Sequence, residues 1–195
     1  MTLKKSVSLR QKIDRAEAGQ LEWVTGLFFS LFLGILLCGT LQLDVFRASA
    51  VYLEDALAAS NLASAIIDVE EYGISRSILI EDPLKAYQIY LFALRSNLNL
   101  DDEWECPQKG LIAGKVRVLD YTVYNVDEEK VFVYHFDEHG QLYSSQGNLG
   151  SVQAPNGKVI ESTSVYSEVT FPVKGIMGVE TVARKSNLAD IVPNE

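Results

Sequence analysis

The stretch AGQLEWVTGLFFSLFLGILLCGTLQLD, residues 18–44, contains the long apolar run that decides how the chain is organised. No charged residue occurs in the 21 positions from Trp23 to Leu43. At about 1.5 Å per helical residue this run spans about 31 Å, which matches the ~30 Å hydrocarbon core of a bilayer. A helix that is apolar on every face is typical of a membrane span. The sequence therefore predicts a transmembrane helix over residues 23–43.

A cleaved secretory signal is the alternative interpretation of this run. Such a signal has an apolar region of about 7–15 residues, followed by small residues at a cleavage site. The run here is longer, and it ends at TLQLD without a small-x-small pattern. We therefore expect the segment to be retained as a single-pass anchor in contact with membrane lipid.

The charges on either side of the run predict its orientation. Residues 1–22 carry five basic and three acidic side chains, whereas residues 23–195 carry twelve basic and twenty-three acidic ones. Because an excess of Lys and Arg marks the cytoplasmic side, residues 1–22 are expected to form a cytoplasmic leader. Residues 44–195 then form one extracytoplasmic domain of the bacterial cell envelope. The acidity of this domain argues against nucleic acid as a partner.

Residues 44–73, DVFRASAVYLEDALAASNLASAIIDVEEYG, contain no helix breaker before Gly73. Apolar residues recur there at spacings of three, four and seven, which is typical of an amphipathic helix. The sequence therefore predicts one continuous helix over residues 23–71, with polar positions every seven residues at Arg47, Glu54, Asn61 and Asp68. The apolar stripe either packs on the chain's own domain or contacts other helices. Its members include Val45, Ala48, Tyr52, Ala59 and Leu62.

The remaining chain predicts one further helix and several strands. Asp82 followed by Pro83 is a helix start, because Asp is a good N-cap and Pro is tolerated at the first helical position. We expect this helix to cover residues 83–98. Val-, Tyr- and Phe-rich segments then predict strands. These strands are expected near 114–126, 130–137, 141–144 and 165–173.

Local signals refine this prediction. Asn156-Gly157 predicts a hairpin turn, and Pro172 predicts that its strand ends there or lies on a sheet edge. The tail, residues 188–195, either adds an edge pairing or stays loose. Helices followed by strands predict an α+β domain with an antiparallel sheet packed by helix.

The sequence offers little support for catalysis. His135 and His139 flank Asp137 and Glu138, but the surrounding pattern is that of a strand and a turn. Residues four apart on a strand lie about 13 Å from each other, so a solvated polar hairpin is favoured over a metal site. No Gly-rich phosphate loop, Gly-x-Ser-x-Gly elbow or HExxH helix occurs in the sequence. We expect no enzymatic activity, no cofactor and no bound metal.

The N-terminal pattern resembles a known family. A short basic leader precedes Gly19, Glu22 is followed by Trp23, and the apolar span leads into VYLEDALAASNLASAI. This arrangement resembles type IV pilin-like subunits, and it is most similar to the TadE-like minor pilins of the tight-adherence (Tad) pilus system. The resemblance implies that a prepilin peptidase cuts between Gly19 and Gln20. It also implies that Glu22 pairs with the freed α-amine of a neighbouring subunit.

Two functions follow as expectations. The first is a minor pilin or pseudopilin, a structural or assembly subunit of a Tad-type pilus or secretion system. Its partners would be other pilin-like subunits or secretion-system membrane proteins, and the helix stripe would be its assembly face. The second is a membrane-anchored extracytoplasmic ligand-binding or sensory module.

Overall fold

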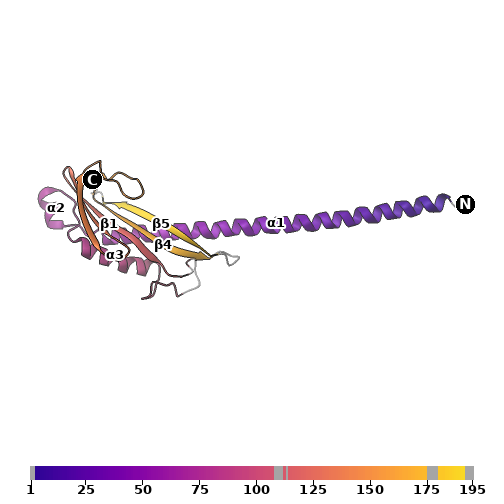
Figure 1. Ribbon diagram of the computed structural model, residues 1–195, viewed down its shortest axis with the longest axis horizontal. Helices are drawn as coiled ribbons and strands as arrows, with labels where there is room; N and C mark the ends of the chain where they lie inside the picture. The colour runs from indigo at the N-terminus through magenta and orange to yellow at the C-terminus, as the bar shows by residue number, and fades with distance from the viewer. Residues whose placement is uncertain (1–2, 108–111, 113, 175–179, 192–195) are drawn as a thin grey trace. The chain divides into compact units, whose positions relative to one another are not determined.

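The computed structural model describes residues 3–107, 112, 114–174 and 180–191, with side chains from Glu22 onward. The chain forms two compact units, one ending at Asp44 and the other beginning at Val45. Helix α1 (Leu3–Ser64) contributes to both (Figure 1). In the first unit the large apolar side chains after Glu22 are exposed, and the helix is long and apolar enough to cross a membrane. The predicted long apolar N-terminal helix is therefore confirmed.

The second unit combines helices with one antiparallel sheet, which confirms the predicted α+β class. The strands lie in the order β3-β2-β1-β4-β5, and all neighbours are antiparallel. The helices that follow α1 are α2 (Val69–Ser75) and α3 (Pro83–Asn97). The strands are β1 (Arg117–Asp127), β2 (Lys130–Phe136), β3 (Leu142–Asn148), β4 (Ser164–Lys174) and β5 (Glu180–Asp190).

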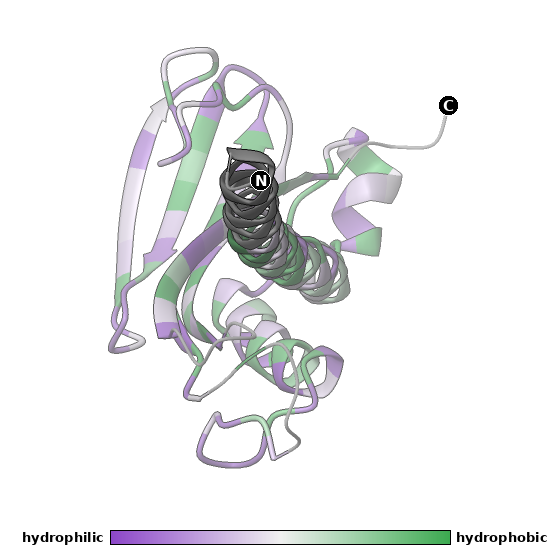
Figure 2. Ribbon diagram, turned by 90° about the vertical axis from the view of Figure 1, so that its right-hand side faces the viewer, coloured by the Kyte–Doolittle hydropathy of each residue, from purple (hydrophilic) through white to green (hydrophobic). Residues whose placement is uncertain are grey.

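The main core lies between one face of the sheet and the helices. Tyr121 of β1 and Phe136 of β2 point to this face, as expected for opposed residues of neighbouring strands. They pack with Tyr90 of α3 and with Leu53 and Leu57 of α1. The alternation of hydrophobic and hydrophilic residues along the strands is visible in Figure 2. The period of two places every second strand residue in this core.

The second face of the sheet is covered in part by the connection from β3 to β4. These strands are separated in the sheet by β2 and β1, so residues 149–163 cross the face to join them. Ala154 and Ile160 of this connection pack in a second small core with Tyr124 and Tyr166. The predicted turn at Asn156-Gly157 is confirmed, because the Gly157 N–H donates to the Ala154 carbonyl at 2.8 Å.

Helix α1 ends seven residues earlier than the sequence predicts, at Ser64 and not at residue 71. Ile67 pairs with Ile80 in an isolated antiparallel bridge. Asp68 then caps a new helix, because its side chain accepts hydrogen bonds from the amides two and three residues on. This new helix, α2, runs through Gly73, which was expected to be the stop. A side chain that caps in a non-helical conformation competes with helix continuation.

Helix α3 is as predicted. The Asp82 side chain accepts hydrogen bonds from the amides of Leu84 and Lys85 at 2.9 and 3.1 Å, and Pro83 is the first helical residue. The helix ends at Asn97, one residue before the predicted limit. The Asp82 and Pro83 signals are enough to predict where this helix begins, because they act locally and do not depend on the rest of the fold.

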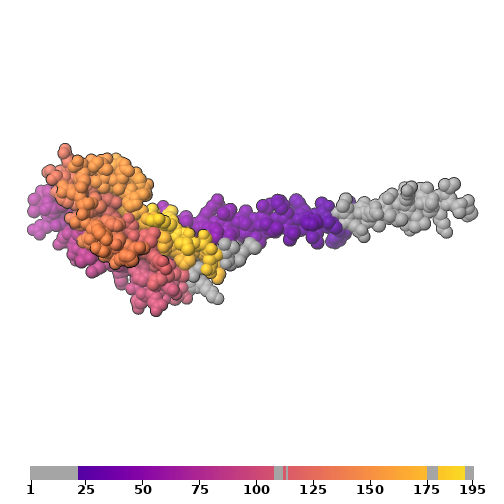
Figure 3. Space-filling model, in the orientation of Figure 1, coloured from indigo at the N-terminus to yellow at the C-terminus, as the bar shows by residue number. Residues whose placement is uncertain are grey.

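The prediction for Pro172 is wrong. Strand β4 continues to Lys174, and it lies between β1 and β5. Pro172 is tolerated because the register with β1 extends only to Thr170, while Pro172 opposes Val182 of β5. The sequence also underestimates β5, which forms an edge strand of eleven residues and lies at the surface in Figure 3. Residues 192–195 of the predicted tail lie outside the described residues.

Candidate functional site

One face of α1 in the second unit belongs to the domain core. Leu53 and Leu57 are fully buried there. The same face carries polar residues that are also buried. These are Ser49, Ser60, Asn61 and Ser64. The face therefore packs against protein along its whole length.

Hydrogen bonds fix this face against the sheet. The Asn61 side-chain amide donates to the Val165 carbonyl at 3.4 Å and to the Asn187 carbonyl at 3.2 Å. The Tyr121 hydroxyl donates to Ser64 Oγ at 2.9 Å. Asn61 was expected among the polar positions of the helix, opposite the apolar stripe, and the structure buries it against the sheet. The seven-residue polar repeat in the sequence does not show that backbone carbonyls of β4 and β5 accept hydrogen bonds from this position.

The predicted apolar stripe lies on a different face of α1. Ala48 and Ala59 are exposed, Tyr52 is 40% exposed and Leu62 is 59% exposed. Only Val45 is half-buried. This exposure argues against packing on the chain's own domain for Ala48, Ala59 and Leu62, whereas Tyr52 contacts the end of α3 in that domain. The domain core instead uses the face that carries Leu53, Ala56 and Leu57.

Further apolar side chains are exposed along this part of the chain. The Tyr52 hydroxyl donates to the Asn97 carbonyl at 3.0 Å, which holds the ring at the end of α3. Besides Tyr52, the exposed large apolar residues between Val45 and Ser75 are Val51, Leu62, Ile66, Val69 and Ile74.

The residues of the predicted processing and pairing sites lie in the first unit. Gly19 and Gln20 lie in α1, and the Gln20 side chain is outside the described part of the chain. Glu22, directly before the uncharged run, and Trp23, its first residue, are both exposed on the helix. If the apolar run spans a membrane, Glu22 lies at the edge of the hydrocarbon layer, where a carboxylate is costly unless a cation pairs with it.

Asp120, Thr122 and His135 form a hydrogen-bonded group on the second face of the sheet. His135 Nδ1 lies 3.1 Å from both Asp120 Oδ1 and Thr122 Oγ1. In a hydrolase triad the carboxylate and the nucleophilic hydroxyl contact opposite nitrogens of the imidazole. Here both contact the same nitrogen, so the ring cannot accept the hydroxyl proton while the carboxylate orients it. The group therefore lacks the geometry of a triad.

His139 lies apart from this group, in the turn that follows β2. Asp137 Oδ1 accepts the backbone N–H groups of Gln141 and His139 at 2.8 and 2.9 Å. The hydrogen bond from Gln141 is the main cause that lowers the pKa of Asp137. The predicted polar hairpin is thus confirmed as an Asp-centred turn. No cluster of three or more metal-ligating His, Cys, Asp or Glu side chains occurs among the residues that the structure describes.

Comparisons of this chain with protein-family models, with curated proteins and with solved structures found no match. Function has to be inferred from the sites themselves, because a fold alone does not specify an activity. The site with the most distinctive physical character is the exposed apolar face of α1.

Proposed function

We propose that the chain is a membrane-anchored assembly subunit of the type IV pilin-like class, a minor pilin or pseudopilin similar to the TadE-like proteins. In this proposal residues 23–43 span the cell membrane, with the leader in the cytoplasm and the second unit outside the cell. The partners are membrane lipid and the apolar helices of other pilin-like subunits or secretion-system membrane proteins. Prepilin peptidase is a further partner if the leader is removed.

The observation that carries this proposal is the exposure of the stripe. Four of its five residues, Ala48, Tyr52, Ala59 and Leu62, stay exposed although the same helix buries another face in the domain core. A helix that packs only on its own domain is normally polar on the face that contacts solvent, so a second apolar face is not expected on it. The second face therefore supports contact with another protein.

The alanines of the stripe indicate what kind of partner fits. Small side chains let two helix backbones approach closely, so that association can rely on packing contacts between the helices. Ala48 lies four residues after Asp44, where the first unit ends, and Ala59 lies three turns further along. A partner that is itself a long helix can contact both positions.

Glu22 supports the proposal from the other end of the apolar run. It is the last charged residue before the run, and its side chain is exposed. In an assembly of pilin-like subunits a freed α-amine from a neighbour supplies the cation that Glu22 lacks on its own helix. This pairing would also set the axial position of one subunit relative to the next.

The test is to enlarge the stripe without touching the core. Ala48→Leu and Ala59→Leu are expected to weaken association with partner subunits by roughly 5- to 150-fold, because overpacking a close helix contact costs about 1–3 kcal/mol. The measurement is the amount of cross-linked partner subunit recovered with the full chain from membranes of the native host. The melting temperature of the variants should equal that of the parent, since both alanines are exposed.

The matched control is Gln88→Leu, which adds an exposed leucine on α3, away from the stripe. This variant should retain the parent's partner recovery. Equal recovery from the stripe variants and the control would remove the support for an assembly role. Loss of partner recovery in all three variants would point to a nonspecific effect of adding an exposed leucine, and it would also contradict the proposal.

The membrane orientation has its own test. Protease added to intact cells that have been stripped of wall or outer membrane should digest the second unit, while the leader stays protected. This expectation rests on the excess of basic residues before the span. Protection of the second unit from the protease would contradict the proposed topology.

A membrane-anchored ligand-binding or sensory module is the second candidate function. The observation that favours it is a pocket lined by Tyr87, Leu91 and Trp104 on the second unit. The two functions differ in the residues they need. A binding module should tolerate Ala48→Leu and Ala59→Leu, whereas an assembly subunit should not.

A further inference from the structure

Strand β3 forms one outer edge of the sheet, and backbone groups on its outer side are open. The Leu149 N–H donates to the Glu129 carbonyl at 2.9 Å, and the Asp137 N–H donates to the Gln141 carbonyl at 3.2 Å. These bonds lie at the two ends of the β2–β3 ladder. They show that the odd-numbered residues of β3 turn their N–H and C=O groups toward β2. The groups that point away from the sheet belong to the even-numbered residues Leu142, Ser144 and Gln146.

The outward groups of this edge are accessible. Within the described part of the chain, the backbone groups of Leu142, Ser144 and Gln146 that face outward have no hydrogen-bond partner. Every residue of β3 except Gly147 is exposed. The open stretch ends at Asn148, whose carbonyl accepts the Ser151 N–H at 3.0 Å. An unpaired edge of this kind is a template for pairing with another strand.

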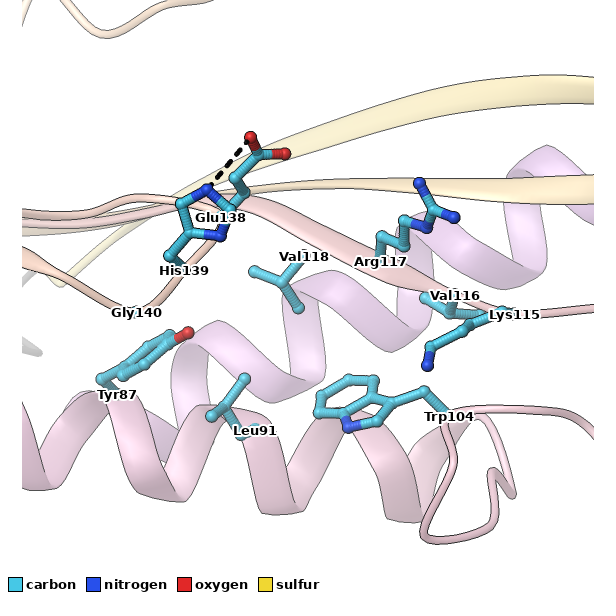
Figure 4. A pocket seen from close by; sticks show the side chains of 10 residues that line it. All are labelled: Tyr87, Leu91, Trp104, Lys115, Val116, Arg117, Val118, Glu138, His139 and Gly140. Atoms are coloured by element: carbon cyan, nitrogen blue, oxygen red, sulfur yellow. Dashed lines mark ion pairs between the residues drawn. The ribbon is translucent and has the colours of Figure 1, made fainter.

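A second unpaired stretch, residues 117–120 of β1, is closed at both ends. Figure 4 shows Arg117 and Val118 of this stretch across a pocket from Leu91 and Trp104. Glu105 and Lys115 pair in an antiparallel bridge at one end, and the β1–β2 ladder begins at Tyr121 at the other. The register with β4 also shifts between Val118 and Asp120. This gap leaves no room for another strand, so the edge of β3 is the better candidate.

The edge of β3 lacks the features that usually protect a sheet edge. Its sequence, LYSSQGN, contains no charged residue and no proline, and its pairing with β2 has no register shift. Natural sheets protect their edges with charges, proline or bulges. The opposite edge of this sheet follows that rule. Strand β5 carries the charged residues Glu180, Arg184, Lys185 and Asp190.

The open edge is complementary to itself. When two copies of β3 lie antiparallel with Ser145 at the centre, Ser144 of each copy lies opposite Gln146 of the other. Both residues carry outward N–H and C=O groups, so each such pair exchanges two hydrogen bonds. The two Ser145 residues then form the close, non-hydrogen-bonded pair at the centre. No charge lies on either strand, so two otherwise acidic units can approach there without direct repulsion.

Side chains on the second face of the sheet also fit this pairing. In the same register Tyr143, which is 48% exposed, lies opposite Gly147 of the other copy. A Cβ added at Gly147 would collide with the Val152 side chain, which lies over this glycine. The Tyr143 ring would therefore contact bare backbone and an apolar side chain. Packing of an aromatic residue beside an edge glycine compensates for the side chain that glycine lacks.

We propose that the β3 edge pairs with the β3 edge of a second copy of this chain, in antiparallel orientation. The pairing joins the sheets of the two copies into one continuous sheet. Main-chain hydrogen bonds supply the affinity, and the position of Tyr143 opposite Gly147 sets the register. The interface is isologous, as expected for a two-fold dimer. It uses no residue of the α1 stripe.

The direction of the strands determines which copies can pair. Within the second unit, α1 runs in the same direction as β5, because Glu54 contacts Lys185 and Asn61 contacts Asn187. Strand β3 also runs in this direction, since neighbouring strands alternate across the sheet. Antiparallel pairing of two β3 strands therefore reverses α1 of one second unit relative to the other. Copies anchored in one membrane face the same way, so the pair forms between two facing membranes.

A disulfide at the centre of the pair gives the first test. Ser145→Cys is made in a full chain that also carries Cys38→Ala and Cys106→Ala, purified in detergent and mildly oxidised. The Cα atoms of the central pair would lie about 4.5 Å apart, within the disulfide range of about 4.4–6.8 Å. We expect a covalent dimer. Thr181→Cys, at an exposed position of β5, is the control and should remain monomeric. No dimer from Ser145→Cys, or equal yields from both, would overturn the proposal.

Proline substitution tests the hydrogen bonds of the edge. Ser144→Pro removes an outward N–H but no bond to β2, and proline is tolerated at such edge positions. It should lower the disulfide yield of the Ser145→Cys chain about tenfold. Val182→Pro is the matched control on β5, where even-numbered residues also point outward, because the Ile191 N–H donates to the Thr163 carbonyl. This control should keep the yield. Equal yields with and without Ser144→Pro would contradict edge pairing.

Clustering of membranes tests the direction of the pair. Phosphatidylcholine vesicles that carry the full chain should cluster, as measured by dynamic light scattering, whereas vesicles with Ser144→Pro should not. Clustering should persist at about 0.5 M salt, because no ion pair holds the edges together. Vesicles with Ala48→Leu or Ala59→Leu should still cluster. Loss of clustering in these stripe variants, or no clustering by the parent, would overturn the proposal.

The proposal rests on the membrane anchor of the proposed function but not on assembly through the stripe. The disulfide test in detergent needs no membrane, so it can succeed even where the anchor fails. A different outcome would assign another occupant to the edge. If Ser145→Cys forms no dimer, while Ser144→Pro lowers recovery of another protein from host membranes, the edge accepts a strand of that protein and self-pairing is wrong.

Discussion

The side-chain amide of Asn61 on α1 donates to both oxygens of Asn187 on β5, at 3.2 Å to the carbonyl and 3.1 Å to Oδ1. Asn61 is fully buried, and its partner Asn187 is half-buried. These bonds join a helix near the beginning of the second unit to the strand that ends it. A buried polar side chain with such partners fixes the position of the helix on the sheet.

Replacement of Asn61 by alanine should therefore destabilise the second unit. The variant leaves the Val165 and Asn187 carbonyls without their donor, and each unsatisfied buried group costs about 1–3 kcal/mol. We expect the free energy of unfolding to fall by about 1–3 kcal/mol. The measurement is urea unfolding of the full chain in detergent, followed by near-ultraviolet circular dichroism. Asn148→Ala, at an exposed position of the edge strand β3, is the control. A similar loss in both variants would contradict the anchoring role of Asn61.

The elements that the sequence predicts well are those with local causes. The uncharged run after Glu22 makes a long apolar helix in any context, and Asp82 with Pro83 starts α3 without help from the fold. The strands β1, β2 and β4 are rich in β-branched and aromatic residues, which is typical of strands. For these elements the local preference and the tertiary structure agree, so boundaries fall within a few residues of the prediction.

The features that the sequence misses depend on distant parts of the chain. Strand β5 has few apolar residues because it is an edge strand, and only its pairing with β4 identifies it. Asn61 is polar in the sequence but buried in the structure, since its partners lie more than 100 positions later. The pocket is missed for the same reason, because Leu91, Trp104 and His139 are brought together only by the fold.

The two faces of α1 predict opposite responses to the same substitution. Ala56 is 6% exposed and belongs to the core, whereas Ala59 is exposed on the stripe. Ala56→Leu should lower the free energy of unfolding by about 1–3 kcal/mol, because extra methylenes in a packed core force strain. Ala59→Leu should change it by no more than about 0.5 kcal/mol, as is usual for surface positions. Urea unfolding of the two full-length variants checks this, and the reverse order would mean that the core face is wrongly assigned.

Buried tyrosines predict a loss of stability at high pH. Burial raises the pKa of Tyr90, Tyr121 and Tyr124 above the ordinary tyrosine value. In the unfolded chain these phenols lose their protons near pH ~10, whereas in the folded chain they keep them. Above that pH the unfolded state binds fewer protons, so the free energy of unfolding falls as the pH rises. Below it, these groups leave stability unchanged.

The check is the urea midpoint of the full chain measured from about pH 8 to about pH 11. The midpoint should fall across the upper part of this range. Tyr90→Phe removes one of the buried phenols and should reduce the fall. A midpoint that declines equally in the parent and in Tyr90→Phe would assign the effect to other groups, such as lysines.

Processing of the leader is tested at the Gly19-Gln20 bond. If the protein enters a pilin-like assembly through a prepilin peptidase, N-terminal sequencing of the membrane-bound form should begin at Gln20. Gly19→Leu should block cleavage, because glycine leaves the backbone open to close approach and leucine does not. Gly26→Ala is the matched control, since a Cβ added at Gly26 meets no atom within 4 Å.

Cleavage after Gly19 makes Glu22 the third residue of the product, near the new α-amine. Glu22→Gln should then preserve the Gln20 start but reduce partner recovery, because the carboxylate that pairs with a neighbour's amine is gone. A start at Met1 or Thr2 in the mature membrane protein would show that the subunit works uncleaved, and it would leave Glu22 without an α-amine partner.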